Sequence, residues 1–409
     1  MNEFNSVRAC KSSEKWENLI SRESFLYGKP DDVRNEFARD YTRILHSLAF
    51  RRLKHKTQVF YNIENDHICT RMEHVYHVES VSYTIATGLG LNTDLTKAIS
   101  IGHDLGHAPF GHQGENIIGK LSKEHLNKPF WHEQNGLKFV ENLELLEDET
   151  MHYQNLNLTY AVRDGIISHC GEIDSNGLKP REEFVNLDSF NTKGQYEPYT
   201  WEGCVVKLAD KIAYVGRDIE DAKRLDFLTK DDLKQLEKFA QKFKSDAVNT
   251  TVIIHSLVSD VCANSSPEKG ICLSEAYANY LKEIKQFNSE KIYNNERLKY
   301  FEEYAKLVIN SIFDVLVSVY NGADTFDAID RGAKNYPVLF YDFKEWLIKY
   351  VDTEITPKEK KDKIAFYDKN KKPYGKLETR EIYVGAVIDY ISGMTDSYAM
   401  RIFNELTTF

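Results

Sequence analysis

The chain has 409 residues, 42% hydrophobic and 28% charged, which is close to ordinary globular usage and excludes general disorder and fibrous repeats. The formal net charge of −10, from 53 basic and 63 acidic residues, argues against broad electrostatic attachment to nucleic acid. At roughly one domain per ~150 residues, this length fits two or three domains or one large helical body.

The sequence also lacks the features that are typical of several classes of protein. No segment approaches the ~18 uninterrupted apolar residues of a membrane-spanning helix, and the first residues lack the apolar core of an export signal. The six cysteines are scattered without CxxC spacing, which argues against a disulfide framework, a zinc ribbon or an iron–sulfur cluster. Because reduced thiols are typical of the cytoplasm, we expect a cytoplasmic protein without a membrane partner.

Apolar residues recur every 3.6 positions over long stretches, and glycine and proline are few, so we predict an all-α fold. In chain order, the predicted helices lie after Asp31-Asp32, at about 70–90, from near Thr93, at about 112–122 and at about 202–224, with several more from 228 onward. Pro109 forces the break before the fourth of these helices. A lysine-rich run at 358–376 is typical of a solvated loop.

Histidine is unevenly distributed along the chain. Residues 67–132 hold eight of the 13 histidines, where an even spread would give about two. Core histidines satisfied by their neighbours explain one or two such cases, so the clustering indicates metal or acid–base chemistry. The eight are His67, His74, His77, His103, His107, His112, His125 and His132.

Two patterns lie within the stretch GHDLGHAPFGHQGE. His103 and Asp104 are adjacent, and His107 follows one helical turn later, so we expect it to face the same side as His103. In the next predicted helix His112 and Glu115 are three apart, so the carboxylate can hold the imidazole and raise its basicity, as a general acid or base requires. A pair of solvent-facing polar residues explains His112 and Glu115 equally well.

His74 lies on the apolar stripe of its predicted helix, with apolar residues four, seven and eleven positions later, and should therefore point inward. Taken singly, it is most simply a hydrogen-bonded core histidine. In combination with His103 and Asp104, it supplies the second imidazole of a metal site with nitrogen and oxygen ligands and room left for water.

The predicted helix at 202–224 has two stripes on different sides. The apolar stripe must be its core face. The second stripe consists of Asp210, Tyr214, Arg217 and Asp221, and by pattern alone it is a solvated face. Nothing in the spacing of these residues connects Asp210 to the histidines.

At this point the sequence resembles the HD-domain superfamily, and specifically the deoxynucleotide triphosphohydrolases, the dGTPase-like group that includes the mammalian SAM-and-HD-domain enzyme. The resemblance rests on six blocks in the right order, FRRLKHKTQVF, NDHICTRMEHVYHV, GHDLGHAPFGHQGE, WHEQNG, VRDGIISHCGE and LADKIAYVGRDIEDA, and on DYISGMTDSYA near the C-terminus. It implies an N-terminal helical segment contributing to the substrate site at 1–64, an HD-domain catalytic core at 65–225 and a C-terminal helical region at 226–409.

The resemblance also implies roles for individual residues, position by position. The metal ligands would be His74, His103, Asp104 and Asp210. The catalytic pair would be His112 and Glu115, with His107 and His132 as two further active-site histidines. The substrate-binding residues would be Arg71 and Lys211 at the triphosphate and Gln58, Tyr214 and Asp218 around the deoxyribose.

The activity implied by the resemblance is metal-dependent hydrolysis of deoxynucleoside triphosphates, with a dGTP-like substrate, to a deoxynucleoside and tripolyphosphate. A divalent ion held by two imidazoles and two carboxylates, whether Mn, Mg, Fe, Co or Ni, can lower the pKa of water and neutralise phosphate oxygens. The substrate phosphates can bring a second Mg ion. The family resemblance further implies a homo-oligomer, either a hexamer or another multiple of a dimer.

Two other functions stay open at this stage. An HD phosphodiesterase or nucleotidase acting on another nucleotide is disfavoured by the block around Gln58 and by the DYISGMTDSYA segment, which are features of the triphosphohydrolases. A nucleotide-sensing or nucleic-acid-binding defence protein is disfavoured by the complete set of ligand and acid–base residues. Single-stranded nucleic acid is compatible with the chain as a partner, but no sequence feature indicates it.

Overall fold

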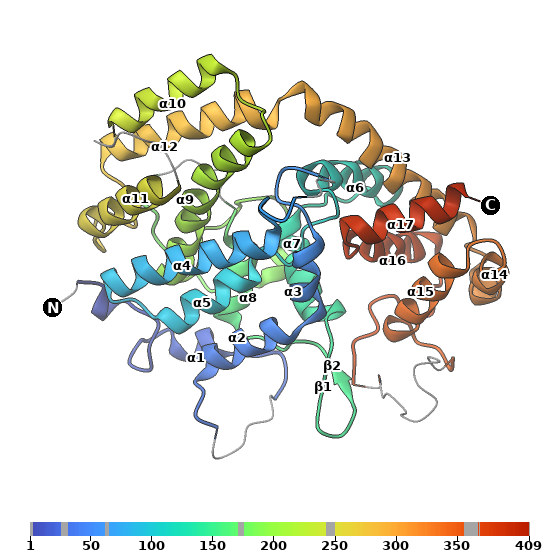
Figure 1. The fold of residues 1–409 in the computed structure, drawn as a ribbon. Coiled ribbons are helices and arrows are strands. Elements are labelled where there is room, and N and C mark those ends of the chain that lie inside the picture. The colour runs from blue at the N-terminus through green and yellow to red at the C-terminus, as the bar shows by residue number, and fades with distance from the viewer. Residues whose placement is uncertain are drawn as a thin grey trace. The chain divides into compact units, whose positions relative to one another are not determined.

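The computed structural model describes residues 3–25, 32–61, 65–170, 176–242, 250–355, 367 and 369–408. Within these ranges, seventeen α-helices and one two-stranded hairpin confirm the predicted all-α fold (Figure 1). The chain forms two compact units. The first comprises Met1–Leu45, Gln58–Asp104 and Leu158–Tyr300, and the second comprises His46–Thr57, Leu105–Asn157 and Phe301–Phe409. The division of roles among 1–64, 65–225 and 226–409 stays a prediction.

The first unit is built almost entirely from helices. They are α1 (Trp16–Ile20), α2 (Glu36–His46), α4 (Arg71–Leu89), α5 (Thr93–Gly102), α8 (Tyr160–Ser168), α9 (Trp201–Arg224), α10 (Lys230–Lys242), α11 (Thr250–Asn264) and α12 (Glu275–Asn288). Short turns accompany them, namely the 3₁₀ turns η1 (Glu3–Ser6) and η4 (Leu187–Ser189) and the π-helical turn η5 (Ser289–Tyr293). At its centre, α4 packs against α5 and α9, and α8 packs against the same two helices.

The second unit holds the remaining elements. They are α3 (Leu48–Arg52), α6 (Gly111–Leu126), α7 (His132–Lys138), α14 (Thr325–Gly332), α15 (Pro337–Leu347), α16 (Arg380–Ser392), α17 (Asp396–Thr407) and the antiparallel strands β1 (Leu146–Glu147) and β2 (Tyr153–Gln154). Its short turns are η2 (Leu53–His55), the π-helical η3 (Phe139–Leu143), η6 (Gly322–Asp324) and η7 (Ile348–Tyr350). Helix α13 (Glu296–Ser318) begins in the first unit and continues in the second.

Helix α4 begins and ends at local sequence signals, as predicted for 70–90. The Thr70 side chain accepts a hydrogen bond from the Glu73 N–H, and the Glu73 carboxylate accepts one from the Thr70 N–H, which together form a capping box. Gly90 ends the helix in the left-handed conformation at φ 73°. The predicted inward stripe is buried along its length, at His74, Val78, Val81 and Ile85. The prediction that His74 points inward is therefore confirmed.

Helix α9 matches the helix predicted at 202–224, but its second stripe differs from the pattern-based interpretation. Asp221 is buried, and its carboxylate accepts a hydrogen bond of 2.9 Å from the backbone N–H of Cys69. Asp210 is largely enclosed, with its side chain 17% exposed. The interpretation of this stripe as a solvated face is therefore wrong, because other segments of the first unit cover it.

Two other predicted helices have different boundaries in the structure. The helix expected after Asp31-Asp32 is interrupted: Ser47 separates α2 from α3, and its side chain caps α3 by accepting the Phe50 N–H. Asp31 itself lies outside the described residues. Helix α5 ends at Gly102, so His103 and His107 do not share a helix, and the expectation that helical spacing puts them on one side is wrong.

The lysine-rich run at 358–376 is described only in part, since residues 358–366 and 368 lie outside the described residues. Its described residues form turns rather than helix or strand, although Asn370 and Tyr374 are buried. All six cysteines are described and are free thiols, in agreement with the expected lack of a disulfide framework. Among the described helices, none has both the length and the apolar character required to cross a membrane.

Candidate metal centre and imidazole cluster

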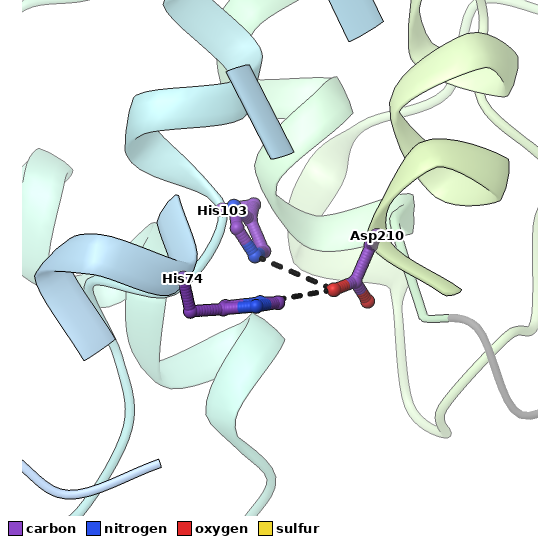
Figure 2. Close-up of side chains that lie close together, drawn as sticks. All are labelled: His74, His103 and Asp210. Atoms are coloured by element: carbon purple, nitrogen blue, oxygen red, sulfur yellow. Dashed lines mark ion pairs between the residues drawn. The ribbon is translucent and has the colours of Figure 1, made fainter. Parts of the chain in front are cut away.

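Four predicted ligands converge inside the first unit. His74 comes from α4, His103 and Asp104 follow the end of α5, and Asp210 comes from α9. Figure 2 shows the rings of His74 and His103 directed toward the carboxylate of Asp210. All four side chains are buried or nearly so.

The distances between the possible ligand atoms fit a single small cation. The Asp210 Oδ1 atom lies 3.1 Å from His74 Nε2 and 3.9 Å from His103 Nε2. The Asp104 Oδ1 atom lies 3.5 Å from His103 Nε2, and its Oδ2 atom lies 3.9 Å from His74 Nε2. Ligand atoms bonded at ~2.0–2.2 Å to one ion are expected roughly 3–4 Å apart. The set of two imidazoles and two carboxylates therefore suits a divalent ion.

A hydrogen bond to the backbone orients the His103 ring for this role. Its Nδ1 lies 2.6 Å from the carbonyl oxygen of Ser100, to which it donates. That bond places the lone pair on Nε2, which is buried and has no hydrogen-bond partner among the described residues. Since buried polar atoms are nearly always satisfied, the bare Nε2 is evidence that the residues present fit a metal ion.

The pKa shifts within this cluster indicate a site that favours positive charge. Burial alone would lower the pKa of His74, but the hydrogen bond and negative charge of Asp210, and the charge of Asp104, raise it above its ordinary value. Burial would raise the pKa of Asp210, yet the hydrogen bond and charge of His74 lower it to about 2. The two carboxylates thus stabilise a cation beside them, which is what a metal ion requires.

His169 is a nearby histidine that the sequence reasoning did not assign. It follows α8, is buried, and its ring lies 5.0 Å from that of His103 between centroids. Its Nδ1 lies 2.7 Å from the Ile166 carbonyl oxygen. His103, Asp104 and His169 each place a possible ligand atom within 4.8 Å of the others. The only signal in the sequence was its place in the block VRDGIISHCGE, since it lies far along the chain from the histidine-rich stretch.

Arg71 contacts a predicted metal ligand and can also bind an anion. Its Nη1 donates to Asp104 Oδ2 at 2.9 Å, and the side chain is only 1% exposed. Its Nε and Nη2 atoms are buried and have no hydrogen-bond partner among the described residues. Lys211, one position after Asp210 on α9, is also buried. Two buried cationic side chains next to the predicted metal ligands are suited to phosphate oxygens.

The remaining predicted substrate residues also lie in the first unit. Asp218 is buried on α9, and its Oδ2 accepts a hydrogen bond of 2.5 Å from the Tyr293 hydroxyl. Burial raises the pKa of Asp218 to about 7, against the opposing effect of that hydrogen bond. Tyr214 is half-buried, and Gln58 has a buried Oε1 without a hydrogen-bond partner in the described residues. Tyr293 was missed because the chain beyond 226 resembles the family only loosely.

The second unit brings together the other predicted site residues, three histidines and one glutamate. Glu115 on α6 accepts hydrogen bonds from His132 at the start of α7, at 2.9 Å from the ring Nδ1 and 3.3 Å from the backbone N–H. The His107 and His132 rings are stacked, with centroids 3.8 Å apart and planes inclined by 18°. His112 is 65% exposed, and its Nδ1 lies 3.8 Å from Glu115 Oε2. Glu115 therefore makes its shorter contact with His132, and its contact with His112 is longer.

Glu115 is the carboxylate on which this imidazole cluster depends. Burial would raise its pKa, but the charge of His132, hydrogen bonds from the neighbouring histidines and the charge of His107 hold it well below the ordinary range. A buried carboxylate that stays ionised attracts positive charge. The cluster therefore has the composition of an acid–base and anion-binding group.

The HD-domain family model matches residues 71–215, which hold this buried cluster of histidines and aspartates. The chain is 34% identical over 376 residues to a protein of Caldanaerobacter subterraneus, covering 92% of this chain and 86% of that one. It is 30% identical over 421 residues to a protein of Rickettsia bellii, covering 95% and 96%, and 32% identical over 383 residues to one of Clostridium tetani, covering 92% and 86%. Each is named a deoxyguanosinetriphosphate triphosphohydrolase-like protein, and the chain belongs to this family.

Proposed function

We propose that this protein hydrolyses deoxynucleoside triphosphates, with a dGTP-like substrate, to a deoxynucleoside and intact tripolyphosphate. The observation that carries the proposal is the convergence of four side chains, in which four nitrogen–oxygen distances are 3.1–3.9 Å and one imidazole nitrogen has no hydrogen-bond partner in the described part of the chain; the four are His74, His103, Asp104 and Asp210. The family relationship supports the same reaction class. Water attacks the α-phosphorus, the bond from phosphorus to the 5′ oxygen breaks, and the 5′ oxygen takes up a proton.

In the first unit, His74, His103, Asp104 and Asp210 would hold the divalent ion. When bound, such an ion lowers the pKa of water and neutralises charge on phosphate oxygens. Arg71 binds triphosphate oxygens through Nε and Nη2, which have no hydrogen-bond partner among the residues described, while Nη1 donates to Asp104. Lys211 adds a second buried positive charge. These local cations counter the overall charge of −10, which otherwise repels a triphosphate.

Gln58, Tyr214 and Asp218 supply hydrogen-bonding groups for the deoxyribose. The Tyr293 hydroxyl fixes the orientation of the Asp218 carboxyl, and the pKa of about 7 leaves that carboxyl able to donate or accept near neutral pH. The Gln58 Oε1, which has no hydrogen-bond partner in the described residues, is an acceptor for a sugar hydroxyl.

The imidazole cluster supplies the proton. We assign His112 as the donor to the 5′ oxygen, because it is the most exposed of the three imidazoles and can exchange protons with water. Glu115 supplies a negative charge to the cluster, and its hydrogen bond fixes the ring of His132. His107 and His132 contribute positive charge for the α-phosphate.

The deciding experiment is product analysis with each of the four dNTPs, singly and mixed, using protein loaded separately with Mn, Mg, Fe, Co or Ni. Chromatography and ³¹P NMR should show a deoxynucleoside and tripolyphosphate. Release of pyrophosphate or monophosphate instead would contradict the proposal and favour another nucleotidase reaction. As a matched control, His255→Ala removes an exposed histidine of α11 in the same unit and should leave turnover unchanged.

Assembly is a further part of the proposal. We propose a homo-oligomer, a hexamer or another multiple of a dimer, on the strength of the family resemblance. Light scattering at micromolar concentration, with and without dNTP, measures the mass directly. A monomer under both conditions would refute this part without affecting the proposed reaction.

A further inference from the structure

The loop Leu105–Phe110 carries His107, and distant side chains hold its backbone at three points within the second unit. The Gly106 carbonyl accepts a hydrogen bond of 2.7 Å from Asn135 Nδ2. The His107 carbonyl accepts a hydrogen bond from Lys56 Nζ. The Phe110 N–H donates to Asp396 Oδ1 at 2.9 Å. The backbone is therefore fixed on both sides of the histidine.

Lys56 and Asp396 are unusual because both are charged and almost completely buried, at 2% and 5% exposed. Lysine and aspartate are rarely buried to this degree without partners. Lys56 also donates to the Ser392 carbonyl at 3.1 Å, and Asp396 Oδ2 accepts the Thr57 N–H at 3.0 Å and the Thr57 hydroxyl at 2.5 Å. Burial raises the pKa of the Asp396 carboxyl, while these hydrogen bonds and the charge of Lys56 act in the opposite direction.

The loop also has little freedom of its own. Phe110 adopts the left-handed conformation at φ 63°, which residues with a side chain rarely take, and its ring is fully buried. At Gly106, a Cβ atom would lie 2.1 Å from both the Gly136 nitrogen and the His132 carbonyl oxygen. The loop backbone therefore presses directly on α7, the helix that begins with His132. Such a conformation persists only where the surroundings hold it in place.

The position of this backbone sets the position of the His107 ring. That ring stacks on His132 at 3.8 Å, and His132 is in turn hydrogen-bonded to Glu115. A displacement of the loop by a fraction of an ångström would disturb the stack. Burying a charged side chain costs free energy even when it is hydrogen-bonded, so Lys56 and Asp396 are better explained by the geometry they impose than by the stability they add.

We propose that Lys56 and Asp396 are positioning residues that clamp the loop Leu105–Phe110 and thereby hold the His107 ring against His132. The effect on catalysis rests on the proposed function, whereas the effect on the His107 ring does not. The three segments that form the clamp are among those that carry the family resemblance. The blocks FRRLKHKTQVF and DYISGMTDSYA supply Lys56 and Asp396, and GHDLGHAPFGHQGE supplies the loop between them.

The test compares Lys56→Met, Asp396→Asn and the double variant with two controls, Lys54→Met and Asp327→Asn, which alter exposed residues of the same unit. Each single variant should lower kcat by about 10–100-fold, because small misplacements of an active-site group have effects of this size. KM and metal content should change less than about threefold, since substrate phosphates and metal are held by other residues. The double variant should be no more than about threefold slower than the slower single variant, because both changes release one loop.

The NMR signals of the histidine rings test the position of the His107 ring directly, and a loss of stability alone would leave them unchanged. In ¹⁵N-histidine NMR, the His107 signals, assigned with His107→Gln, should shift in both clamp variants and stay unchanged in both controls. If both variants retain wild-type kcat and His107 signals, the clamp is refuted, and multiplicative losses in the double variant would likewise refute it.

If Lys56→Met does not fold, Lys56→Gln, which keeps a donor, replaces it. A smaller shift in Asp396→Asn than in Asp396→Ala supports the clamp, and equal shifts overturn it. If the wild-type protein hydrolyses no dNTP, the proposed function fails, while the His107 signals still decide the clamp.

Discussion

The molecule contains two histidine clusters built from the same residue types but in different proportions. In the first unit, His74 and His103 meet two carboxylates, and the surplus of negative charge suits a cation. In the second unit, three histidines share two carboxylates, since Glu115 lies 2.9 Å and Glu133 lies 3.5 Å from the Nδ1 atom of His132, so imidazoles outnumber carboxylates. The comparison teaches that the ratio of carboxylates to imidazoles decides whether a histidine cluster favours a metal ion or an anion.

The largest loss of activity is expected when a predicted metal ligand is removed from the cluster in the first unit. His103→Ala or Asp104→Ala should abolish bound metal and reduce turnover at least ~10³-fold, because each removes a ligand atom. Elemental analysis and a dNTPase assay on the same sample measure both effects. Full metal occupancy in either variant would show that the ligand assignment is wrong, and His255→Ala should match the wild type in both measurements.

In the second cluster, substitutions should reduce the rate without removing the metal. His112→Ala should lose roughly 10²–10⁴ in kcat, the usual contribution of a positioned acid or base. Glu115→Gln should lose less, and the double variant should be little worse than His112→Ala, since residues that act as a unit are non-additive. Metal content should stay at the wild-type level in all three.

The hydrogen bond between Glu115 and His132 sharpens this prediction. If the proton donor is His132 instead, His132→Ala should cost more than His112→Ala, and Glu115→Gln should show no further loss when combined with His132→Ala. A multiplicative loss for Glu115→Gln with His112→Ala would point to the same reassignment. The ranking of the two alanine variants by kcat therefore decides which imidazole is the acid.

The smallest predicted effect concerns stability in the first unit. The pKa of Asp218 is about 7 in the folded protein against an ordinary value of 3.8, so the folded state keeps a proton that the unfolded chain loses. Stability should therefore fall as pH rises from about 4 to 7 and level off above 7. Between pH 5.5 and 8.5, the loss attributable to Asp218 is about 2 kcal/mol.

Chemical denaturation of metal-free protein at these two pH values tests the effect, because a nearby ion would alter the pKa. Asp218→Asn should lack this part of the pH dependence, since an amide does not titrate. Asp231→Asn, an exposed change on α10, is the control and should follow the wild type. An identical pH dependence in Asp218→Asn and the wild type would show that this carboxyl has an ordinary pKa.

Local signals in the sequence predicted those parts of the fold that local interactions determine. Thr70, Glu73 and Gly90 specify both ends of α4, and the apolar spacing around His74 predicts its inward direction. The end of α5 before His103 could not be predicted, because nothing in the residues after Gly102 prevents another helical turn. The break at Ser47 likewise depends on a hydroxyl that caps α3 only once α2 has ended.

In the candidate site, residues close in sequence were easier to interpret than residues brought together by folding. The spacing of His112 and Glu115 was visible, whereas the bond from Glu115 to His132 spans 17 positions and was not. Asp210 was connected to the histidines only through the family resemblance, since its helix pattern indicated a solvated face. Tyr293, Lys56 and Asp396 act through contacts between distant segments, for which periodicity carries no signal.

The hydrogen bonds from Thr57 to Asp396 join residues 339 positions apart, and this has a consequence for how the protein is made. A ribosome delivers Lys56 and Thr57 long before Asp396. Until α17 emerges, the loop that carries His107 lacks one of its anchors, so the second unit completes its structure only after α17 has been made. Contacts of such long sequence separation form slowly, and a chain truncated before α17 would expose buried polar groups to chaperones and proteases.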